Sequence, residues 1–329
     1  MHENGTALRM LTAFCSLGRG EFILDGEPRL RERPVKPLAD ALNNLGADVA
    51  CTGEGAPVTV RANGLPGGET VLDCSRSSQF LSALLVAGAF SHDGIAVKAQ
   101  GLVSRPYVDI THHLMMRFGL KVEFLPGDVF KVPGRQKAKA VELAVESDTS
   151  SAAYFFAAAA LCGGSARILN LPSGSLQADM MFVDVLRRMG ADAQYGGDWV
   201  EVRGTGQLSG MEIDMGDFPD SVPLLAAVAP FCSTPTTIKN VPHLRLKESD
   251  RIAAIQQELE RCGAKVESGP DWLKVYPSEI IGCVVDSHND HRIAMSMSVL
   301  GLRSRGVEID GAECVEKSFP EFFEYLEKL

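Results

Sequence analysis

The sequence predicts an α/β protein built from a repeated unit of about 70 residues that contains two helices and several strands. Three observations support this prediction. A motif that ends a helix occurs four times at an even spacing, and a series of apolar helices keeps the same period. Short β-branched runs lie between the helices and predict strands. The period is too long for a thin solenoid, so we expect the units to pack into compact domains.

The first series marks the end of one helix in each unit. Four segments share an amphipathic helix end, a glycine and the start of a strand: ALNNLGADV (41–49), LMMRFGLKV (114–122), VLRRMGADA (185–193) and ELERCGAKV (258–266). Their glycines are 73, 71 and 73 residues apart. Glycine just past a helix end is the usual left-handed cap. Four such caps at even spacing indicate a repeat rather than chance.

The second series is a set of apolar helices led by small or capping polar residues. Thr6, Ser78, Ser150, Asp220 and Asp290 anchor them at spacings of 72, 72, 70 and 70 residues. Alanine, leucine and methionine occur nearly all round these helices, so we expect them to be buried. The expected strands between helices include VTVRA (58–62), GIAVKA (94–99), ARILNL (166–171) and TTIKNV (236–241).

Bulk composition indicates an ordinary globular protein. The chain has 329 residues, 45% hydrophobic and 22% charged, which predicts about two domains. The net charge of −10 argues against a nucleic-acid partner, but a locally basic cleft for small anions stays possible. The eight cysteines form no Cys-x-x-Cys pair, and we expect most of them to be reduced thiols in the cytoplasm. No signal peptide and no membrane span are expected.

The heads of the apolar helices are the expected site of chemistry. A helix N-terminus presents free N–H groups and partial positive charge, so several heads in one cleft would bind phosphate and carboxylate. Arginines in the loops 26–34, 104–109 and 245–251 would add bidentate partners for such anions. The alternative is that these residues are plain N-caps and solvated surface charge. His288 and His291 lie three residues apart, but without a third ligand we expect no metal site.

Seven motifs then resemble successive signatures of the EPSP synthase family, in family order, from about residue 3 to 329. They are GEPRLRERP, DCSRSSQFLSALL, SRPYVDIT, ESDTSSAAYFFAAAA, RLKESDR, NDHRIAM and EKSFPEFF. The resemblance implies a two-domain enolpyruvyl transferase fold of six βαβαββ units, with the active site in the cleft between domains. It also implies transfer of the enolpyruvyl group of phosphoenolpyruvate to the 5-hydroxyl of shikimate 3-phosphate, in the shikimate pathway of aromatic amino-acid biosynthesis, without metal or cofactor.

The resemblance also implies roles for individual residues. The phosphoenolpyruvate side comprises Gly5, Arg33, Gln79, Arg251, Arg292 and Lys317. The shikimate 3-phosphate side comprises Ser77, Ser78, Ser104, Tyr107, Asp220 and Lys247. Asp220 would take the proton of the attacking hydroxyl, Glu248 would protonate the methylene carbon, and Lys317 would assist proton transfer or neutralise the leaving phosphate. Without the resemblance, a helix cap at Asp220 and a surface pair of Glu248 with Arg251 would be the simpler interpretations.

The chain also departs from the family pattern. The opening Lys-Ser…Asn-Arg motif is not found before Gly5, so we expect five of the six units, with two in a first domain (1–145) and three in a second (146–329). We therefore expect exposed apolar helix surface and a need for the missing N-terminal unit, although the full-length family enzyme is expected to be a monomer. His243 and Leu244 stand where the family usually has other residues.

Three alternatives stay open. The chain could be a catalytically inactive remnant or a complementing fragment of the same enzyme. The sister enzyme that acts on UDP-N-acetylglucosamine needs a reactive loop cysteine, whereas Cys74 lies in the SRSSQF context of the shikimate enzyme. RNA-terminal phosphate cyclases use similar repeats, but the acidic net charge argues against RNA.

Overall fold

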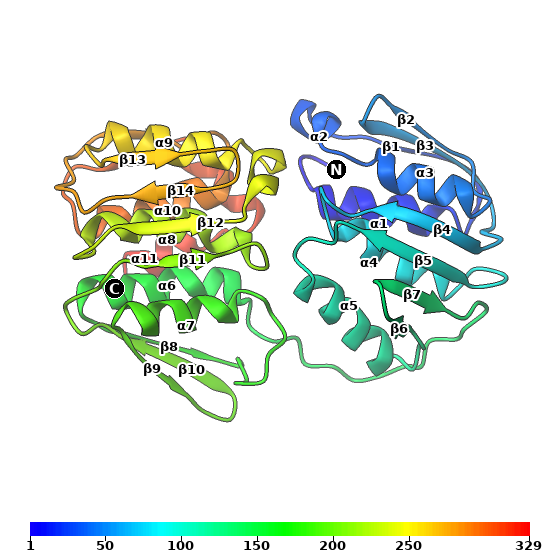
Figure 1. The fold of residues 1–329 in the computed structure, drawn as a ribbon, viewed down its shortest axis with the longest axis horizontal. Helices are drawn as coiled ribbons and strands as arrows, with labels where there is room; N and C mark the ends of the chain where they lie inside the picture. Colours follow the sequence, from blue (N-terminus) through cyan, green and yellow to red (C-terminus); the bar gives the residue numbers. More distant parts are fainter. The chain divides into compact units, whose positions relative to one another are not determined.

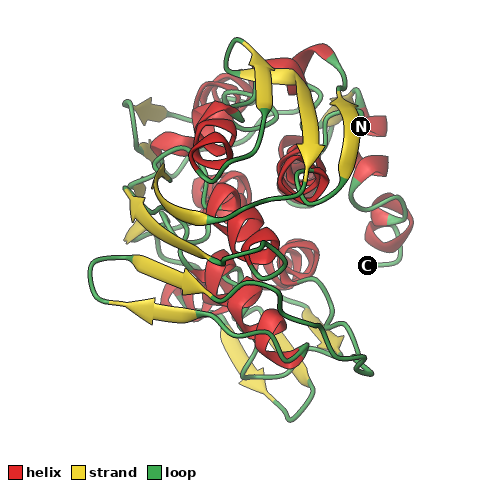
Figure 2. Ribbon diagram, turned by 90° about the vertical axis from the view of Figure 1, so that its right-hand side faces the viewer, coloured by secondary structure: helices red, strands yellow, loops and turns green.

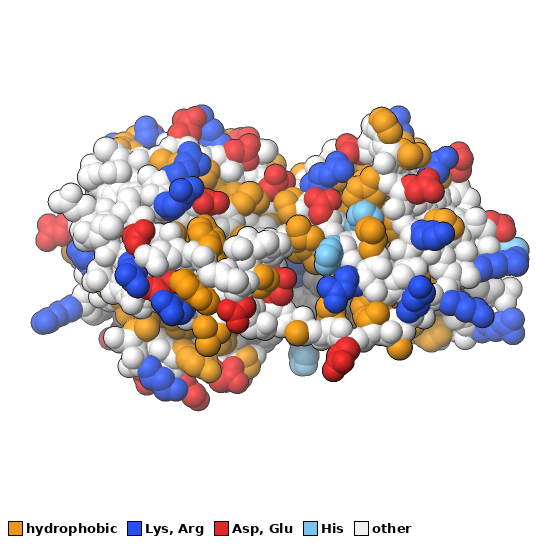
Figure 3. Space-filling view, turned by 90° about the horizontal axis from the view of Figure 1, so that it is seen from below, with side chains coloured by type: hydrophobic (Ala, Val, Ile, Leu, Met, Phe, Trp, Pro, Cys, Tyr) orange, Lys and Arg blue, Asp and Glu red, His pale blue; other side chains and the backbone are white.

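The computed structural model describes residues 1–329 and divides into two compact units, Met1–Leu143 and Ala144–Leu329 (Figure 1). The apolar central helices lie inside, and the strands lie toward the outside (Figures 1 and 2). None of the helices combines the length and apolar character needed to cross a bilayer. On the face shown in Figure 3, Lys and Arg side chains are interspersed with Asp and Glu side chains.

Unit 1 consists of two sheets and the helices that cover them. Its helices are α1 (Gly5–Cys15), α2 (Pro28–Glu32), α3 (Lys36–Asn44), α4 (Gln79–Gly88) and α5 (Pro106–Arg117). Its strands are β1 (Arg19–Leu24), β2 (Val49–Thr52), β3 (Gly55–Asn63), β4 (Gly68–Asp73), β5 (Ile95–Gln100), β6 (Glu123–Leu125) and β7 (Val129–Val132). The sheet orders are β1-β3-β2 and β4-β5-β7-β6, and only β4 and β5 are parallel to each other.

The central helices of unit 1 differ in burial. Helix α4 buries eight of its ten residues, as its apolar sequence predicts. Helix α1 packs against α4, but its residues Leu11 and Phe14 are 39% and 63% exposed to solvent. Helix α1 therefore has two apolar side chains on its exposed side, whereas α4 is buried almost all round.

Unit 2 contains three sheets around three central helices. Its helices are α6 (Thr149–Cys162), α7 (Met180–Met189), α8 (Val222–Val228), α9 (Arg251–Arg261), α10 (His291–Gly301) and α11 (Phe322–Leu326), with the 3₁₀ turns η1 (Pro219–Ser221), η2 (Ala229–Phe231), η3 (Pro242–Leu246) and η4 (Ala312–Lys317). Helices α6, α8 and α10 pack against one another in its interior.

The strands of unit 2 form one four-stranded sheet and two smaller ones. They are β8 (Ser165–Leu169), β9 (Asp192–Tyr195), β10 (Trp199–Arg203), β11 (Glu212–Asp214), β12 (Thr236–Lys239), β13 (Val266–Ser268), β14 (Leu273–Val275), β15 (Val284–Asp286) and β16 (Glu308–Asp310). The orders are β8-β10-β9, β11-β12-β14-β13 and β15-β16. The pairs β11–β12 and β15–β16 are parallel, and α8 and α10 are their crossover helices, as α4 is for β4 and β5.

The predicted repeat signals are confirmed at the local level. The four cap glycines have φ values of +90°, +76°, +120° and +87°, in the region that favours glycine (Gly46, Gly119, Gly190 and Gly263). All four expected strands overlap observed strands, namely β3, β5, β8 and β12. Six cysteines are free, as predicted for most of them, whereas Cys262 and Cys283 form a disulfide.

Candidate active site

Several of the predicted site residues lie in segments that follow parallel strands. In unit 1 the loop after β4 holds Ser77 and Ser78, and the loop after its parallel partner β5 holds Ser104. In unit 2 the loops after β11 and β12 lead to Asp220 and Lys247. The carboxyl ends of parallel strands meet at one edge of a sheet, and ligands of open α/β sheets bind beyond that edge.

The same rule places two further candidates on the last sheet. The loop after β15 leads to Arg292, and the turn after β16 ends in Lys317. The two loops are joined by a backbone hydrogen bond of 3.0 Å from Ser287 N–H to the Asp310 carbonyl. Lys317 is therefore placed at the same edge of this sheet as the head of α10.

In unit 1 the head of α1 closely contacts an arginine. A Cβ built on Gly5 would lie 2.7 Å from Cζ of Arg33, so any other residue here would force this guanidinium to move. Arg33 is almost fully buried and donates from Nη1 to the carbonyl of Glu3 at 3.0 Å. Two residues predicted for the phosphoenolpyruvate side are thus brought together by the tertiary structure.

A second arginine connects this corner to α4. Arg9 donates from Nη1 to Oε1 of Gln79 at 2.6 Å, and from Nε and Nη2 to the Pro34 carbonyl at 3.2 Å. Gln79 in turn donates from Nε2 to Oγ1 of Thr6 at 2.9 Å. Gln79 is therefore oriented by α1. Arg9 was not among the predicted site residues, and no sequence pattern pointed to this bridge, whose two residues are 70 positions apart.

The predicted shikimate 3-phosphate residues of unit 1 line two adjacent loops. Ser78 is buried and precedes the first residue of α4, and Ser77 Oγ accepts from the N–H of Gln79 at 3.3 Å. Ser104 is buried with φ +49°, and its carbonyl accepts from the N–H of Tyr107 at 3.3 Å, in the first turn of α5. The loops are linked by a 2.8 Å bond from Cys74 N–H to the Gln100 carbonyl.

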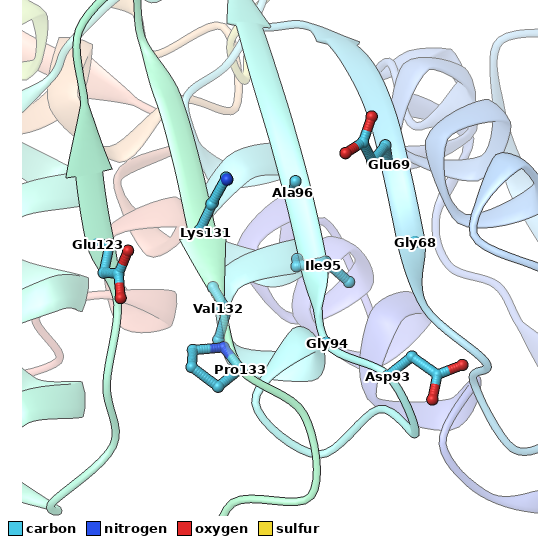
Figure 4. Close-up of a pocket in the computed structure, with 10 residues that line it drawn as sticks. All are labelled: Gly68, Glu69, Asp93, Gly94, Ile95, Ala96, Glu123, Lys131, Val132 and Pro133. Atoms are coloured by element: carbon cyan, nitrogen blue, oxygen red, sulfur yellow. The ribbon is translucent and has the colours of Figure 1, made fainter.

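The cavity drawn in Figure 4 lies at the other end of the same strands. It has a volume of about 390 Å³ and is lined by residues that include Gly68 and Ile95, where β4 and β5 begin. The serines follow the opposite, carboxyl ends of these strands. This cavity is therefore separate from the predicted site, which is defined by clusters of side chains.

In unit 2 the predicted residues form an ionic cluster around Arg251. Arg251 is 1% exposed, and it donates from Nε and Nη2 to both oxygens of Asp290 at 2.8 and 3.1 Å. It also donates from Nη1 to Asp220 at 2.9 Å and from Nη2 to Glu248 at 2.9 Å. The pair of Glu248 with Arg251 is thus part of a buried network and not a surface helix pair.

Asp220 is surrounded by three cations. Besides Arg251, Nη2 of Arg292 donates to Oδ2 of Asp220 at 3.0 Å, and Nζ of Lys247 lies 3.4 Å from Oδ1. About a fifth of the Asp220 side chain is exposed, so an incoming ligand can reach the carboxylate. Burial alone would raise the pKa of Asp220, but Arg292, Lys247 and Arg251 outweigh it and hold this pKa well below 3.8.

Two carboxylates that were not among the predicted site residues complete the cluster. Asp290 is fully buried, caps α10 by accepting from the N–H of Arg292 at 3.0 Å, and has a lowered pKa because Arg251 overcomes the effect of burial. Asp179 accepts from Ser221 Oγ at 2.5 Å and from Ser150 Oγ at 2.7 Å, and burial raises its pKa. The NDHR motif pointed to Asp290, whereas no sequence signal marked Asp179.

The two histidines with shifted pKa values are packed as neutral side chains. Burial and the positive charge of Lys247 lower the pKa of His243 to about 4. Burial and Arg292 lower the pKa of His291 to about 3. Both ring nitrogens of His243 are buried without a hydrogen-bond partner. The ionic cluster thus keeps nearby histidines uncharged.

Comparison with known proteins gives one consistent family. The model of the family EPSP synthase (3-phosphoshikimate 1-carboxyvinyltransferase) matches residues 1–326. A 3-phosphoshikimate 1-carboxyvinyltransferase of Marinomonas sp. (strain MWYL1) is 43% identical over 97% of this chain and 76% of its own length. That of Methanoculleus marisnigri is 44% identical over 98% of this chain and 77% of its own length. The chain therefore spans about three quarters of these relatives.

Solved structures agree with the sequence relatives. EPSP synthase from Acinetobacter baumannii superimposes with a TM-score of 0.81 at 27% identity, covering 99% of this chain and 77% of that one. The enolpyruvyl transferase NikO from Streptomyces tendae has a TM-score of 0.74 at 21% identity over 97% of this chain and 74% of its own, which shows a shared fold. The protein described here belongs to the EPSP synthase family and has the enolpyruvyl transferase fold.

Proposed function

We propose that the chain transfers the enolpyruvyl group from phosphoenolpyruvate to the 5-hydroxyl of shikimate 3-phosphate and releases inorganic phosphate. The observation that supports this most directly is the ring of Arg251, Arg292 and Lys247 around the partly exposed Asp220. A base beside several cations is what the addition of a hydroxyl to an anionic enol phosphate requires. Family membership supports the identity of both substrates.

The ion pairs of the cluster suggest how ligand binding activates the base. Without ligand, Arg292 and Lys247 neutralise Asp220 and hold its pKa low. Phosphate and carboxylate groups of the substrates are bidentate partners for the same cations. When these anions engage Arg292 and Lys247, Asp220 loses counter-charge, its pKa rises, and it becomes a better acceptor for the hydroxyl proton.

The reaction then proceeds in two balanced steps. In the addition, the 5-hydroxyl oxygen bonds to C2 of phosphoenolpyruvate, Asp220 takes the hydroxyl proton, and Glu248 delivers a proton to C3, giving a tetrahedral intermediate. In the elimination, Glu248 takes a proton back from C3, the C2–O bond to phosphate breaks, which restores the double bond, and the proton held by Asp220 leaves with the phosphate. We propose that Lys317 assists these proton transfers or neutralises the leaving phosphate.

The unit 1 residues would hold the substrates. We propose that Arg33 and Gln79 bind phosphoenolpyruvate, with Gly5 contributing its backbone and the space that Arg33 needs. Ser77 and Ser78 would bind shikimate 3-phosphate. Ser104 and Tyr107, which are held together at the head of α5, would act on the same substrate. Ser77, Ser78 and Ser104 follow the carboxyl ends of the parallel strands β4 and β5, where ligands of α/β sheets bind.

Phosphate release by the purified chain tests the proposal. The chain is incubated with both substrates, with each substrate alone, and with both substrates after addition of the separately made N-terminal segment of the Marinomonas relative. Phosphate release that requires both substrates, with or without the added segment, supports the proposed transferase activity. No release in any arm, from protein with a cooperative unfolding transition, would support the alternative of an inactive remnant.

A further inference from the structure

The loop between β15 and α10 has an unusual backbone. Two consecutive residues other than glycine, His288 and Asn289, adopt the left-handed region with φ values of +51° and +52°. Side chains disfavour this conformation, so it persists only where the surroundings impose it. The loop ends at Asp290, the N-cap of α10 and the partner of Arg251. Whatever imposes this turn therefore also sets the position of Asp290.

A fully buried carboxylate from another helix contacts this loop. Glu258, on α9, is 0% exposed and accepts from His288 Nε2 at 2.9 Å and from the Asp286 N–H at 3.1 Å. Its second oxygen also lies 3.2 Å from Arg261. The loop adds its own bond, from the His288 N–H to Oδ1 of Asp286 at 2.7 Å. Glu258 thus contacts the residues on which the left-handed turn begins.

The spacing on α9 shows that this contact and the ionic cluster share one support. Arg251 and Glu258 are seven residues apart, or two helical turns, so they lie on the same face of α9. Arg251 pairs with Asp290 and Glu258 pairs with His288, so α9 contacts the loop at two points. At the far end of α9, the Cys262–Cys283 bond joins the helix to the residue before β15.

We propose that Glu258 and His288 are positioning residues for the reaction. Their contact imposes the left-handed turn, which keeps Asp290 against Arg251 and places the Arg292 side chain toward Asp220. Neither residue touches substrate. This inference rests on the proposed function, because its consequence is the orientation of Arg251 and Arg292, the two arginines assigned to phosphoenolpyruvate.

Kinetics of point variants test the inference. His288→Ala and Glu258→Ala are expected to raise KM for phosphoenolpyruvate by roughly 10- to 100-fold, because the residues that support a binding group set its alignment. The change in KM for shikimate 3-phosphate should be smaller. His288→Gln keeps a hydrogen-bond donor near the position of Nε2, so its KM for phosphoenolpyruvate should lie close to the wild-type value. The KM of the double Ala variant should be no higher than that of the more affected single variant, since the two substitutions remove the same contact.

Glu201 provides the matched control. It is also a buried carboxylate of unit 2, paired with Arg167 and Arg203 on the β8-β10-β9 sheet. Glu201→Ala should lower the melting temperature as much as Glu258→Ala but leave KM for phosphoenolpyruvate near the wild-type value. If His288→Ala changes only the melting temperature, or if Glu201→Ala raises this KM equally, the positioning role is wrong.

Amide hydrogen exchange separates this inference from the proposed function. His288→Ala should speed exchange of the amides of Asp290 and Arg292, and Glu201→Ala should not. Wild-type protein without turnover would contradict the proposed function, and the exchange result would still test the positioning role of Glu258 and His288. Unchanged exchange in His288→Ala would overturn it.

Discussion

The arginines near the predicted site have different kinds of partner in the two units. In unit 1, Arg9 and Arg33 donate to backbone carbonyls and to the Gln79 amide. In unit 2, Arg251 and Arg292 donate to the carboxylates of Asp220, Glu248 and Asp290. Carbonyls orient a guanidinium, whereas carboxylates also compete with any anionic ligand for it. The comparison suggests that unit 2 exchanges internal ion pairs for ligand ion pairs, and unit 1 presents arginines that are already oriented.

The largest expected effect is the loss of the carboxylate at the centre of the unit 2 cluster. Asp220→Asn is expected to lower kcat by about 10²- to 10⁴-fold, because it removes the proposed base while keeping the side-chain shape. Single-turnover phosphate release measures this loss, with a melting curve to confirm folding. A decrease of less than tenfold in folded protein would assign the base to another residue.

The next effect concerns stability of the same cluster. Arg251→Met is expected to lower the free energy of unfolding by about 3–5 kcal/mol, because it leaves buried carboxylates such as Asp290 without a counter-charge. Both tryptophans, Trp199 and Trp272, belong to unit 2, so tryptophan fluorescence during urea unfolding reports on that unit. Arg33→Met serves as the comparison in unit 1, and its fluorescence transition should stay unchanged.

Mild acid is expected to weaken unit 2 before unit 1. The folded-state pKa values of His243 and His291, about 4 and about 3, lie below the ordinary value of 6.5. The unfolded chain therefore binds protons first, and stability present above pH 6.5 is lost as pH falls toward 4. Asp179 has the opposite sign, since its raised pKa adds stability as pH falls through that value. In unit 1, the lowered pKa values of Asp25 and Asp73 matter only below 3.8.

Urea unfolding between pH 7 and pH 4.5 measures this difference. The midpoint of the fluorescence transition should fall with pH, with His243 contributing on the order of 1.4 kcal/mol for each unit by which its pKa is lowered. His243→Leu should remove that part of the pH dependence. A slope that is unchanged in this variant would show that His243 is protonated without cost in the folded protein.

The smallest effect is expected at the corner of unit 1. Gly5→Ala places a methyl group 2.7 Å from Cζ of Arg33, so the guanidinium must move and KM for phosphoenolpyruvate should rise by about tenfold. The flexible arginine can yield, so the melting temperature should change little. Gly174→Ala is the control, because a Cβ there meets nothing within 4 Å. Equal KM values for the two variants would exclude the Gly5–Arg33 contact from substrate binding.

Local signals in the sequence predicted much of the fold. The four cap glycines, the apolar helices and the β-branched runs all mark elements that the structure contains. Each signal depends on a few neighbouring residues, such as a left-handed cap that only glycine adopts easily. The sequence motifs also named Asp220, Glu248 and Arg251, which the structure brings into one cluster.

Other parts of the site depend on contacts between distant segments. The bridge from Arg9 to Gln79 spans 70 residues, and that from Arg292 to Asp220 spans 72 residues. Glu258 reads in sequence as an ordinary helix residue, and only packing makes it a buried acceptor for His288. Pairwise contacts of this kind leave no periodic trace in the chain, so sequence patterns could not reveal them.

The amino-acid sequence by itself determined the repeat, the heads of the central helices and the kinds of side chain that stand there. The tertiary structure alone decided which of those side chains meet. Parallel pairing of β4 with β5, β11 with β12, and β15 with β16 brings their following loops to common sheet edges. Strand pairing is a non-local interaction that depends on the burial of whole helices. It determines which charged side chains come close enough to pair with each other.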